Sequence, residues 1–181
     1  MPSNKLNYTK KLVSHNQFGD ILCIVSPDIL NFQHTQNAMP LELHFKEYVN
    51  NLTMICMRLD EEKRNNFKYR LYPTNYNRET WGIKNKFISA GLESYIDKSN
   101  KVFYERISEC RLALITYTPN ATGNETLSAN FPTLIYWNPK HWELRDEVKY
   151  YYELLEKVGI YHRTVESLTK KIEEVYYNID E

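Results

Sequence analysis

Short apolar runs alternate with longer amphipathic stretches along this chain, and the alternation limits the folds it can adopt. The runs at 20–27, 67–73, 93–96, 111–117 and 133–138 are predicted to be strands, and "RLALITY" at 111–117 is the strongest. Strands separated by helical crossovers form a parallel sheet with helices on both faces. We therefore expect a single Rossmann-like α/β domain with three layers and a mostly parallel sheet.

The stretches between the runs have the spacing of helices, which gives the order βαβαβαβαβαα. Gly91 and Gly159 are predicted to end helices, and Ser99 and Thr164 to cap them. The residues at helical spacing are Leu41, Phe45, Tyr48, Leu52 and Ile55; Trp81, Lys84 and Ile88; Phe103, Ile107 and Cys110; Leu144, Val148, Tyr151, Leu155 and Val158; and Val165, Leu168, Ile172 and Val175.

Composition narrows the class of protein. The 181 residues fit one domain, which we place at 19–178 after a polar lead-in at 1–18. Lys plus Arg equals Asp plus Glu at 23 each, which argues against nucleic-acid partners and a polybasic membrane anchor. No apolar stretch reaches the length of a membrane span, and no signal peptide is visible, so a cytoplasmic location is expected. The three cysteines are expected to be free core residues.

Two polar clusters directly follow predicted strands. "TPNATGNET" comes after the strand at 111–117, and "NPKHW" comes after the strand at 133–138. Ligands of parallel α/β sheets bind outside the carboxyl ends of the strands. Both clusters are therefore predicted to lie at the ligand-binding edge.

The first cluster has the features of a phosphate or ribose site. Glu125 is predicted to start a helix, and the amides of a helix start are unpaired and favour an anion. Thr122 and Asn124 add side-chain donors, and Gly123 allows close approach of a ligand. A carboxylate does not suit a phosphate, but Glu125 is suited to sugar hydroxyls. The alternative is that Glu125 only complements the helix dipole.

Arg70 and Tyr72 share one face at the end of the second predicted strand. An arginine at that position can bind a diphosphate through two donors, and a surface salt bridge is the alternative. In the second cluster, Lys140 and His141 are candidate hydrogen-bond donors to a phosphate. His141 could instead act as an acid, although a single histidine is more often structural. The five histidines show no metal-ligand spacing, so no metal is expected.

Three segments resemble the C-terminal region of a family of transferases from O-antigen and surface-polysaccharide loci. They are "YRLYPTNYNRETWGIKNKF", "RLALITYTPNATGNETLSANFPTLIYWNPKHWELRDEVKYYYELLEKVGI" and "TVESLTKKIEEVYY". The family pattern runs through "RLYP" and a "DYGW"-like segment to "ETL-AN-PT--FW-PKHWELR". The match covers roughly residues 20–178, and the block from Glu125 to Arg145 is the most specific part. More distantly, the pattern is similar to the donor-binding half of GT-B glycosyltransferases.

The resemblance implies a nucleotide-sugar donor as substrate and no separate cofactor. It makes Glu125 a candidate ribose ligand and residues 122–124 candidate phosphate contacts, with Arg70 as diphosphate partner. It also makes Asn138, Lys140 and His141 candidate site residues without individual roles, and it names no catalytic residue.

The sequence also departs from the family pattern. Family members are longer and carry an N-terminal domain, so the resemblance implies a chain that needs an acceptor domain as partner and is inactive alone. "TYTPNATGNE" is one residue longer than the family loop, and "TNYNRETW" lacks the acid and the glycine of "DYGW".

Two other functions stay open. One is a non-catalytic binding or interaction module, either a split-gene subunit or a truncated remnant, that needs an N-terminal partner domain. In the split-gene case the Tyr-rich segment "KYYYELLEKVGIYH" is the candidate docking surface. The other is a flavodoxin-like or response-regulator domain, which would have an acidic pocket where this sequence has Ser26-Pro27-Asp28.

Overall fold

A computed structural model describes residues 14–28, 42–72, 80–116, 121–141 and 143–178. Its strands form one five-stranded parallel sheet in the order β2-β1-β3-β4-β5. Their bounds are β1 (Asp20–Ile24), β2 (Phe67–Arg70), β3 (Cys110–Thr116), β4 (Thr133–Tyr136) and β5 (Tyr161–His162). The predicted α/β class with a parallel sheet is confirmed.

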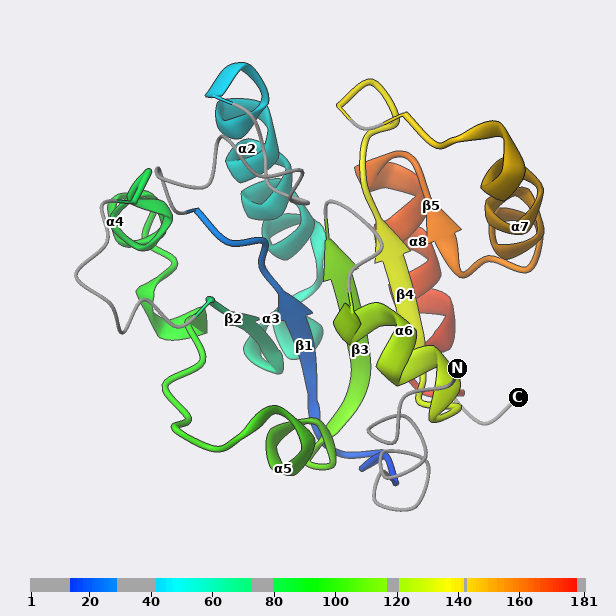
Figure 1. The fold of residues 1–181 in the computed structure, drawn as a ribbon. Helices are drawn as coiled ribbons and strands as arrows, with labels where there is room; N and C mark the ends of the chain where they lie inside the picture. The colour runs from blue at the N-terminus through cyan, green and yellow to red at the C-terminus, as the bar shows by residue number, and fades with distance from the viewer. Residues whose placement is uncertain (1–13, 29–41, 73–79, 117–120, 142, 179–181) are drawn as a thin grey trace.

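Helices cover both faces of this sheet (Figure 1). They are α2 (Glu42–Arg58), α3 (Glu61–Asn65), α4 (Ile83–Ser89), the 3-10 helix η2 (Glu93–Tyr95), α5 (Phe103–Ile107), α6 (Ala121–Ser128), α7 (Asp146–Lys157) and α8 (Val165–Val175). Apolar residues of α2, α4 and α8 pack in one cluster on one face, and those of α5, α6 and α7 pack on the other. The predicted three-layer architecture is therefore present.

The strand order creates a switch point between β1 and β3. The chain leaves β1 through α2 toward β2, and it leaves β3 through α6 toward β4 on the opposite face. At such a point the connections diverge and open a crevice at the carboxyl ends of the two strands, where α/β proteins bind their ligands. The fold thus places the candidate site beyond Ile24 and Thr116.

The strand predicted at 93–96 is only partly formed. Residues 93–95 form η2, and Ile96 makes one parallel bridge to Tyr69 on the free side of β2. Asp97 N–H also donates to the Tyr69 carbonyl oxygen at 2.8 Å. This bridge occupies the outer position of the Rossmann order 3-2-1-4-5-6. The strand prediction was wrong in extent because four residues that include Glu and Ser give too few ladder bonds.

Several other predictions of strands and helices also need correction. Tyr161–His162 forms β5, which the sequence did not suggest, because two residues carry no periodicity. In α4 the buried residues are Ile83 and Phe87, whereas Ile88 is exposed. Cys110 begins β3 instead of ending α5.

Capping was predicted correctly at only one of the two positions. Val102, not Ser99, is the N-cap residue of α5. Thr164 caps α8 as predicted, since its hydroxyl accepts from Ser167 N–H at 3.2 Å.

The three cysteines are free and buried, as expected for core residues. Burial raises the pKa of Cys56 to about 11 and that of Cys110 to about 12, so both are neutral thiols at pH 7. None of the helices in the described ranges is long and apolar enough to cross a bilayer.

Candidate functional site

Tyr48 of α2 closes the switch point between β1 and β3. Thr116 Oγ1 donates to the Ile24 carbonyl oxygen at 2.7 Å and lies 2.7 Å from the Tyr48 hydroxyl. The single hydroxyl proton of Thr116 is used in the bond to Ile24, so in the other bond the Tyr48 hydroxyl donates to Thr116 Oγ1. The same hydroxyl accepts from Ser26 N–H at 2.9 Å. One buried tyrosine therefore fixes the carboxyl ends of both strands that flank the crevice.

Helix α6 begins at this edge, earlier than predicted. It starts at Ala121, so residues 122–124 form its first turn and Glu125 follows instead of starting the helix. Gly123 and Glu125 are buried, and Asn124 is exposed. The first amides of a helix lack carbonyl partners within the helix itself, and those of α6 lie at the carboxyl edge of the sheet. Residues 118–120 of the predicted loop lie outside the described residues.

A second group of polar side chains joins α2 to the turn after β4. Glu47 Oε1 accepts from Asn138 Nδ2 at 2.7 Å, and Glu47 Oε2 lies 3.1 Å from His141 Nε2. The His141 ring stacks on His44 with centroids 4.4 Å apart and planes 12° apart. We call His44, Glu47, Asn138 and His141 the Glu47 cluster.

The electrostatics of the Glu47 cluster favour an ionised carboxylate. The hydrogen bond from His141, followed by the bond from Asn138 and the charge of Lys140, lowers the pKa of Glu47. An ionised carboxylate can only accept, so His141 carries a proton on Nε2. The His141 side chain is 5% exposed, and His44 Nδ1 is buried without a partner in the described parts of the chain.

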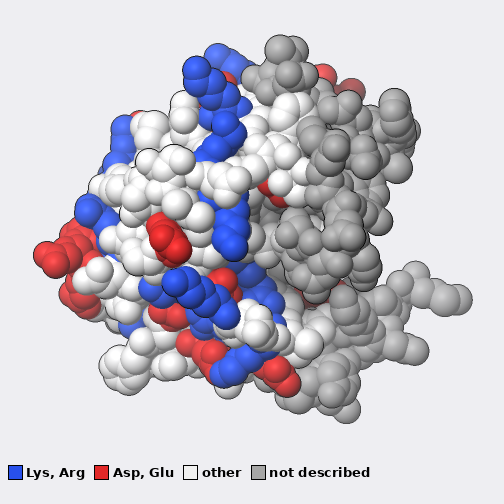
Figure 2. All heavy atoms as spheres, turned by 90° about the vertical axis from the view of Figure 1, so that its left-hand side faces the viewer, with Lys and Arg blue, Asp and Glu red and all other residues white. Residues whose placement is uncertain are grey.

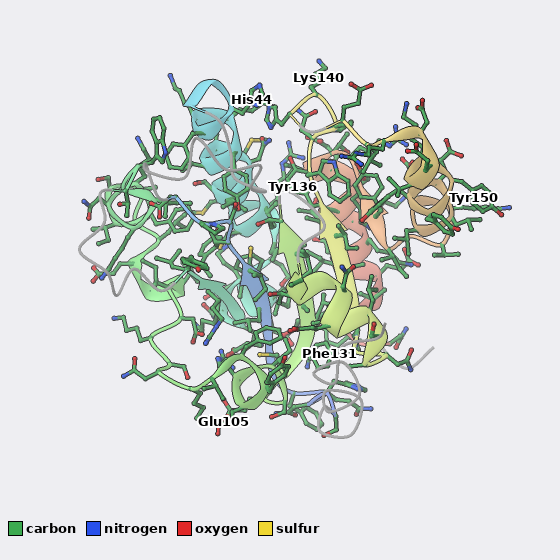
Figure 3. All side chains as sticks on the ribbon, in the orientation of Figure 1. His44, Glu105, Phe131, Tyr136, Lys140 and Tyr150 are labelled. Atoms are coloured by element: carbon green, nitrogen blue, oxygen red, sulfur yellow. The ribbon has the colours of Figure 1, made fainter. Side chains whose placement is uncertain are left out.

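The turn at 138–141 is held by its own backbone as well. Asn138 Oδ1 accepts from Lys140 N–H at 3.0 Å, and the Asn138 carbonyl oxygen accepts from His141 N–H at 2.9 Å. His44 and Lys140 lie at the same end of the molecule, with the Lys140 side chain pointing outward (Figure 3). Asn138 and His141 are thus brought to one place, while the ammonium group of Lys140 faces solvent.

Arg70 belongs to a different group of charges. Its Nη1 donates to Asp97 Oδ2 at 2.9 Å, and its Nη2 donates to the Lys101 carbonyl oxygen at 2.7 Å. Arg106 Nε donates to Asp97 Oδ1 at 3.1 Å and reaches Asp20 through Nη2. We call Asp20, Arg70, Asp97 and Arg106 the Asp97 network. Both ends of the Arg70 guanidinium group are engaged, which favours the salt-bridge interpretation of this residue.

Tyr72 follows β2 and is 48% exposed. The face of the molecule on this side carries Lys and Arg next to Asp and Glu, so charges of both signs are mixed there (Figure 2). Asp28, in the segment after β1, accepts from Ile83 N–H at 2.9 Å and so caps α4. This buried carboxylate has a structural partner, unlike the open acidic pocket of a response regulator.

Comparison with known proteins identifies the family. A family model described as "LIC12162 family transferase" matches residues 1–181. The chain belongs to this transferase family. No curated protein and no solved structure matches it. The transferase class expected from the sequence is therefore confirmed for this LIC12162 family member.

In this LIC12162 family member, α2 supplies candidate site residues that the sequence did not single out. Tyr48 was predicted as a core residue only, and His44 and Glu47 were not predicted at all. Glu47 and Asn138 are 91 positions apart, so no local pattern could indicate their contact. No group of three or more His, Cys, Asp or Glu residues suited to a metal ion occurs among the described residues.

Proposed function

We propose that this chain is the nucleotide-sugar-binding part of a glycosyltransferase-like transferase. The observation that carries the proposal is the switch point between β1 and β3, with the start of α6 beside it. Membership of a transferase family and the Rossmann-like sheet support the same assignment. The sequence resemblance to proteins of surface-polysaccharide and O-antigen loci suggests that the product belongs to such a polysaccharide.

In the proposed complex the first turn of α6 binds the diphosphate. Residues 121–124 present backbone amides, and Thr122 and Asn124 add side-chain donors. Gly123 is buried in this turn. Glu125 is placed one residue beyond this turn, and we assign it to the ribose hydroxyls because a carboxylate accepts two such bonds.

Asn138 and His141 are proposed to border the donor site from the β4 side. Their shared partner Glu47 lies next to Tyr48 in the sequence, and Tyr48 reaches the switch point. Lys140 adds positive charge at the mouth, and Tyr72 is available from the end of β2. Arg70 is left out of the proposed site because Asp97 and Lys101 already use both ends of its guanidinium group.

The chemistry that follows is glycosyl transfer with a diphosphate leaving group. An acceptor hydroxyl oxygen bonds to the anomeric carbon, and the bond from that carbon to the phosphate oxygen breaks with its electron pair. The hydroxyl proton goes to a base that we assign to no described residue. The α6 amides would stabilise the charge that develops on the phosphate, which is electrostatic catalysis by preorganised donors.

Replacement of Glu125 tests the assignment. Nucleotide binding by calorimetry is expected to weaken at least about tenfold in Glu125→Gln, because loss of a charged hydrogen bond is worth roughly 1.5–3 kcal/mol. Glu173→Gln, on the exposed side of α8, is the matched control and should bind as wild type. Unchanged affinity in Glu125→Gln, with an unchanged melting temperature of the free protein, would contradict the ribose role.

A second candidate, an interaction module, is favoured by the surface of α7. This helix buries no residue fully, and Val148, Tyr150, Tyr151 and Leu154 on it, together with Val158 directly after it, are exposed apolar residues. Several exposed apolar side chains on one helix make it a candidate interaction site. If this is the function, Tyr151→Glu will abolish association with an acceptor domain and leave nucleotide affinity unchanged.

A further inference from the structure

Helix α7 presents large apolar side chains to solvent. It lies at the outer edge of the molecule beside β5 (Figure 1), and the Tyr150 side chain points outward from it (Figure 3). Tyr150 and Tyr151 are each 62% exposed, and Leu154 and Val158 are exposed as well. Tyrosines next to aliphatic side chains are typical anchors of protein–protein interfaces.

These side chains share one face of the helix with two charged residues. At 3.6 residues per turn, about one third of the helix circumference carries a set of six residues, which are Glu147, Tyr150, Tyr151, Leu154, Lys157 and Val158. We call this set the α7 face. Glu147 lies in the first turn and Lys157 in the last turn, and both are exposed. The α7 face is therefore acidic at one end, apolar in the middle and basic at the other end.

We propose that the α7 face pairs with the same face of a second copy of this chain, with the two helices antiparallel. An antiparallel pair that sets Tyr150 against Leu154 of the second copy also sets Glu147 against Lys157 of the second copy, since both pairs are centred on position 152. The two-fold symmetry then repeats each contact. The proposal concerns the free chain, so it goes beyond nucleotide binding and stands without it.

The charges of the α7 face favour this arrangement. In the antiparallel pair, each end brings one carboxylate against one ammonium group. In a parallel pair, Glu147 would face Glu147 and Lys157 would face Lys157, and like charges across an interface are unfavourable. A face that is acidic at one end and basic at the other is complementary to itself when reversed. A second copy therefore supplies both the apolar surface and the charges that the α7 face fits.

Sedimentation velocity of the purified chain at low ionic strength tests the pairing. One helix from each chain buries little surface, so the dimer is expected to be weak: mostly formed at about 100 µM and mostly dissociated at about 1 µM. The measurement contains no nucleotide, so its outcome does not depend on the proposed donor site. Failure of the donor site and failure of the dimer are therefore separate results.

Two charge reversals test which residues meet. Glu147→Lys sets lysine against lysine at both ends of the pair, and Lys157→Glu sets glutamate against glutamate. Each variant should therefore dimerise about tenfold more weakly than the wild type, because two exposed ion pairs become two repulsive contacts. In a one-to-one mixture of the two variants every lysine faces a glutamate again, so a heterodimer of wild-type affinity should form. Glu173→Lys and Lys170→Glu, at exposed positions of α8, are the matched controls and should dimerise as the wild type does.

The proposal is overturned if both charge variants dimerise as the wild type does, or if their mixture stays monomeric. A wild-type chain that is monomeric at about 100 µM also overturns it, and would leave the α7 face to a different partner. Should a charge variant fail to melt cooperatively, Leu154→Asp decides alone. It places a charge in the apolar middle of the pair and should abolish the dimer, whereas an unchanged dimer overturns the proposal.

Discussion

Two polar groups tie loops to the sheet, and they differ in what they are made of. The Asp97 network uses guanidinium and carboxylate groups, and the side chains of Asp97 and Arg106 are 5% and 6% exposed. The Glu47 cluster uses two imidazoles, an amide and a carboxylate that is 52% exposed. The first group consists of buried charged groups, whereas in the second group the carboxylate is exposed to water.

This difference separates a group that stabilises the fold from a group that we propose borders the donor site. Buried charges that are fully paired are costly to disturb, and the Asp97 network joins β1, β2 and α5 through such pairs. A half-exposed pair contributes little to stability, so we expect the Glu47 cluster to matter less for the fold than the Asp97 network. Arg70 shows why the two groups must be told apart. From the sequence, an arginine at the end of a strand was a candidate phosphate ligand, but in the structure Arg70 is part of the Asp97 network.

The largest effect is expected from Arg106→Met. It leaves Asp97 buried with one partner fewer, and breaking a buried pair costs about 3–5 kcal/mol. Urea unfolding should show this loss. Arg163→Met removes an arginine whose pair with Glu156 is about half exposed, so it should cost under about 1 kcal/mol. Equal effects of the two substitutions would contradict the structural role of the network.

A smaller effect is expected from Tyr48→Phe, at the switch point between β1 and β3. The substitution removes the acceptor of Ser26 N–H and the donor to Thr116 Oγ1. Buried groups left unsatisfied cost roughly 1–3 kcal/mol, which urea unfolding can measure. If stability falls by less than about 0.5 kcal/mol, Tyr48 does not fix the strand ends.

Glu47→Gln is expected to change the free energy of unfolding by less than about 1 kcal/mol, because its carboxylate is half exposed. Asp97→Asn is the matched comparison, since it also replaces a carboxylate that binds two partners. It should be clearly more destabilising in the same urea experiment. A loss for Glu47→Gln as large as for Asp97→Asn would make the Glu47 cluster a structural group.

The smallest expected effect is the pH dependence of stability that comes from His162. This imidazole has no carboxylate partner among the described residues. Its ring lies 3.0 Å from the Gly159 carbonyl oxygen and 3.3 Å from Ser167 Oγ. Burial lowers the pKa of His162 in the folded state, so the unfolded chain binds more protons. The contribution of His162 to the free energy of unfolding is therefore complete above about pH 6.5, the pKa of the unfolded chain. It falls as the pH drops from there toward the lower pKa of the folded state.

His162→Gln should therefore flatten the dependence of the melting temperature on pH between 7.5 and 5.5. The comparison of the two proteins isolates this ring from other titrating groups. A steeper dependence in the variant would contradict the sign of the pKa shift.

The sequence predicted the sheet well where the local signal was strong. "RLALITY" became β3, and Phe45, Tyr48, Leu52 and Ile55 form the buried face of α2. In and around α7 the prediction was right for Leu144 and Leu155, which pack against the sheet. It was wrong for Val148, Tyr151 and Val158, which are exposed, and it missed Tyr152, which packs inward. An amphipathic helix with aromatic residues on several sides does not reveal which side faces the core.

The candidate site was predictable only in part. Strand order could be used to place the clusters after 117 and 138 at one edge, because carboxyl ends of parallel strands lie together. The pairing of Glu47 with Asn138 and His141, and of Arg70 with Asp97, depends on distant segments meeting in space. These contacts decide which polar residues are free for a ligand, and local periodicity carries no information about them.

Thermal shift with UDP, CDP, GDP, CMP and ADP on the purified chain tests the central claim most directly. A ligand at about 100 times its dissociation constant stabilises by roughly 2.7 kcal/mol, which is about 5–10 °C for a domain of this size. We predict such a shift with nucleotides of one base and a smaller shift, or none, with the others. A cooperative melting transition that no nucleotide moves would contradict the proposed donor site.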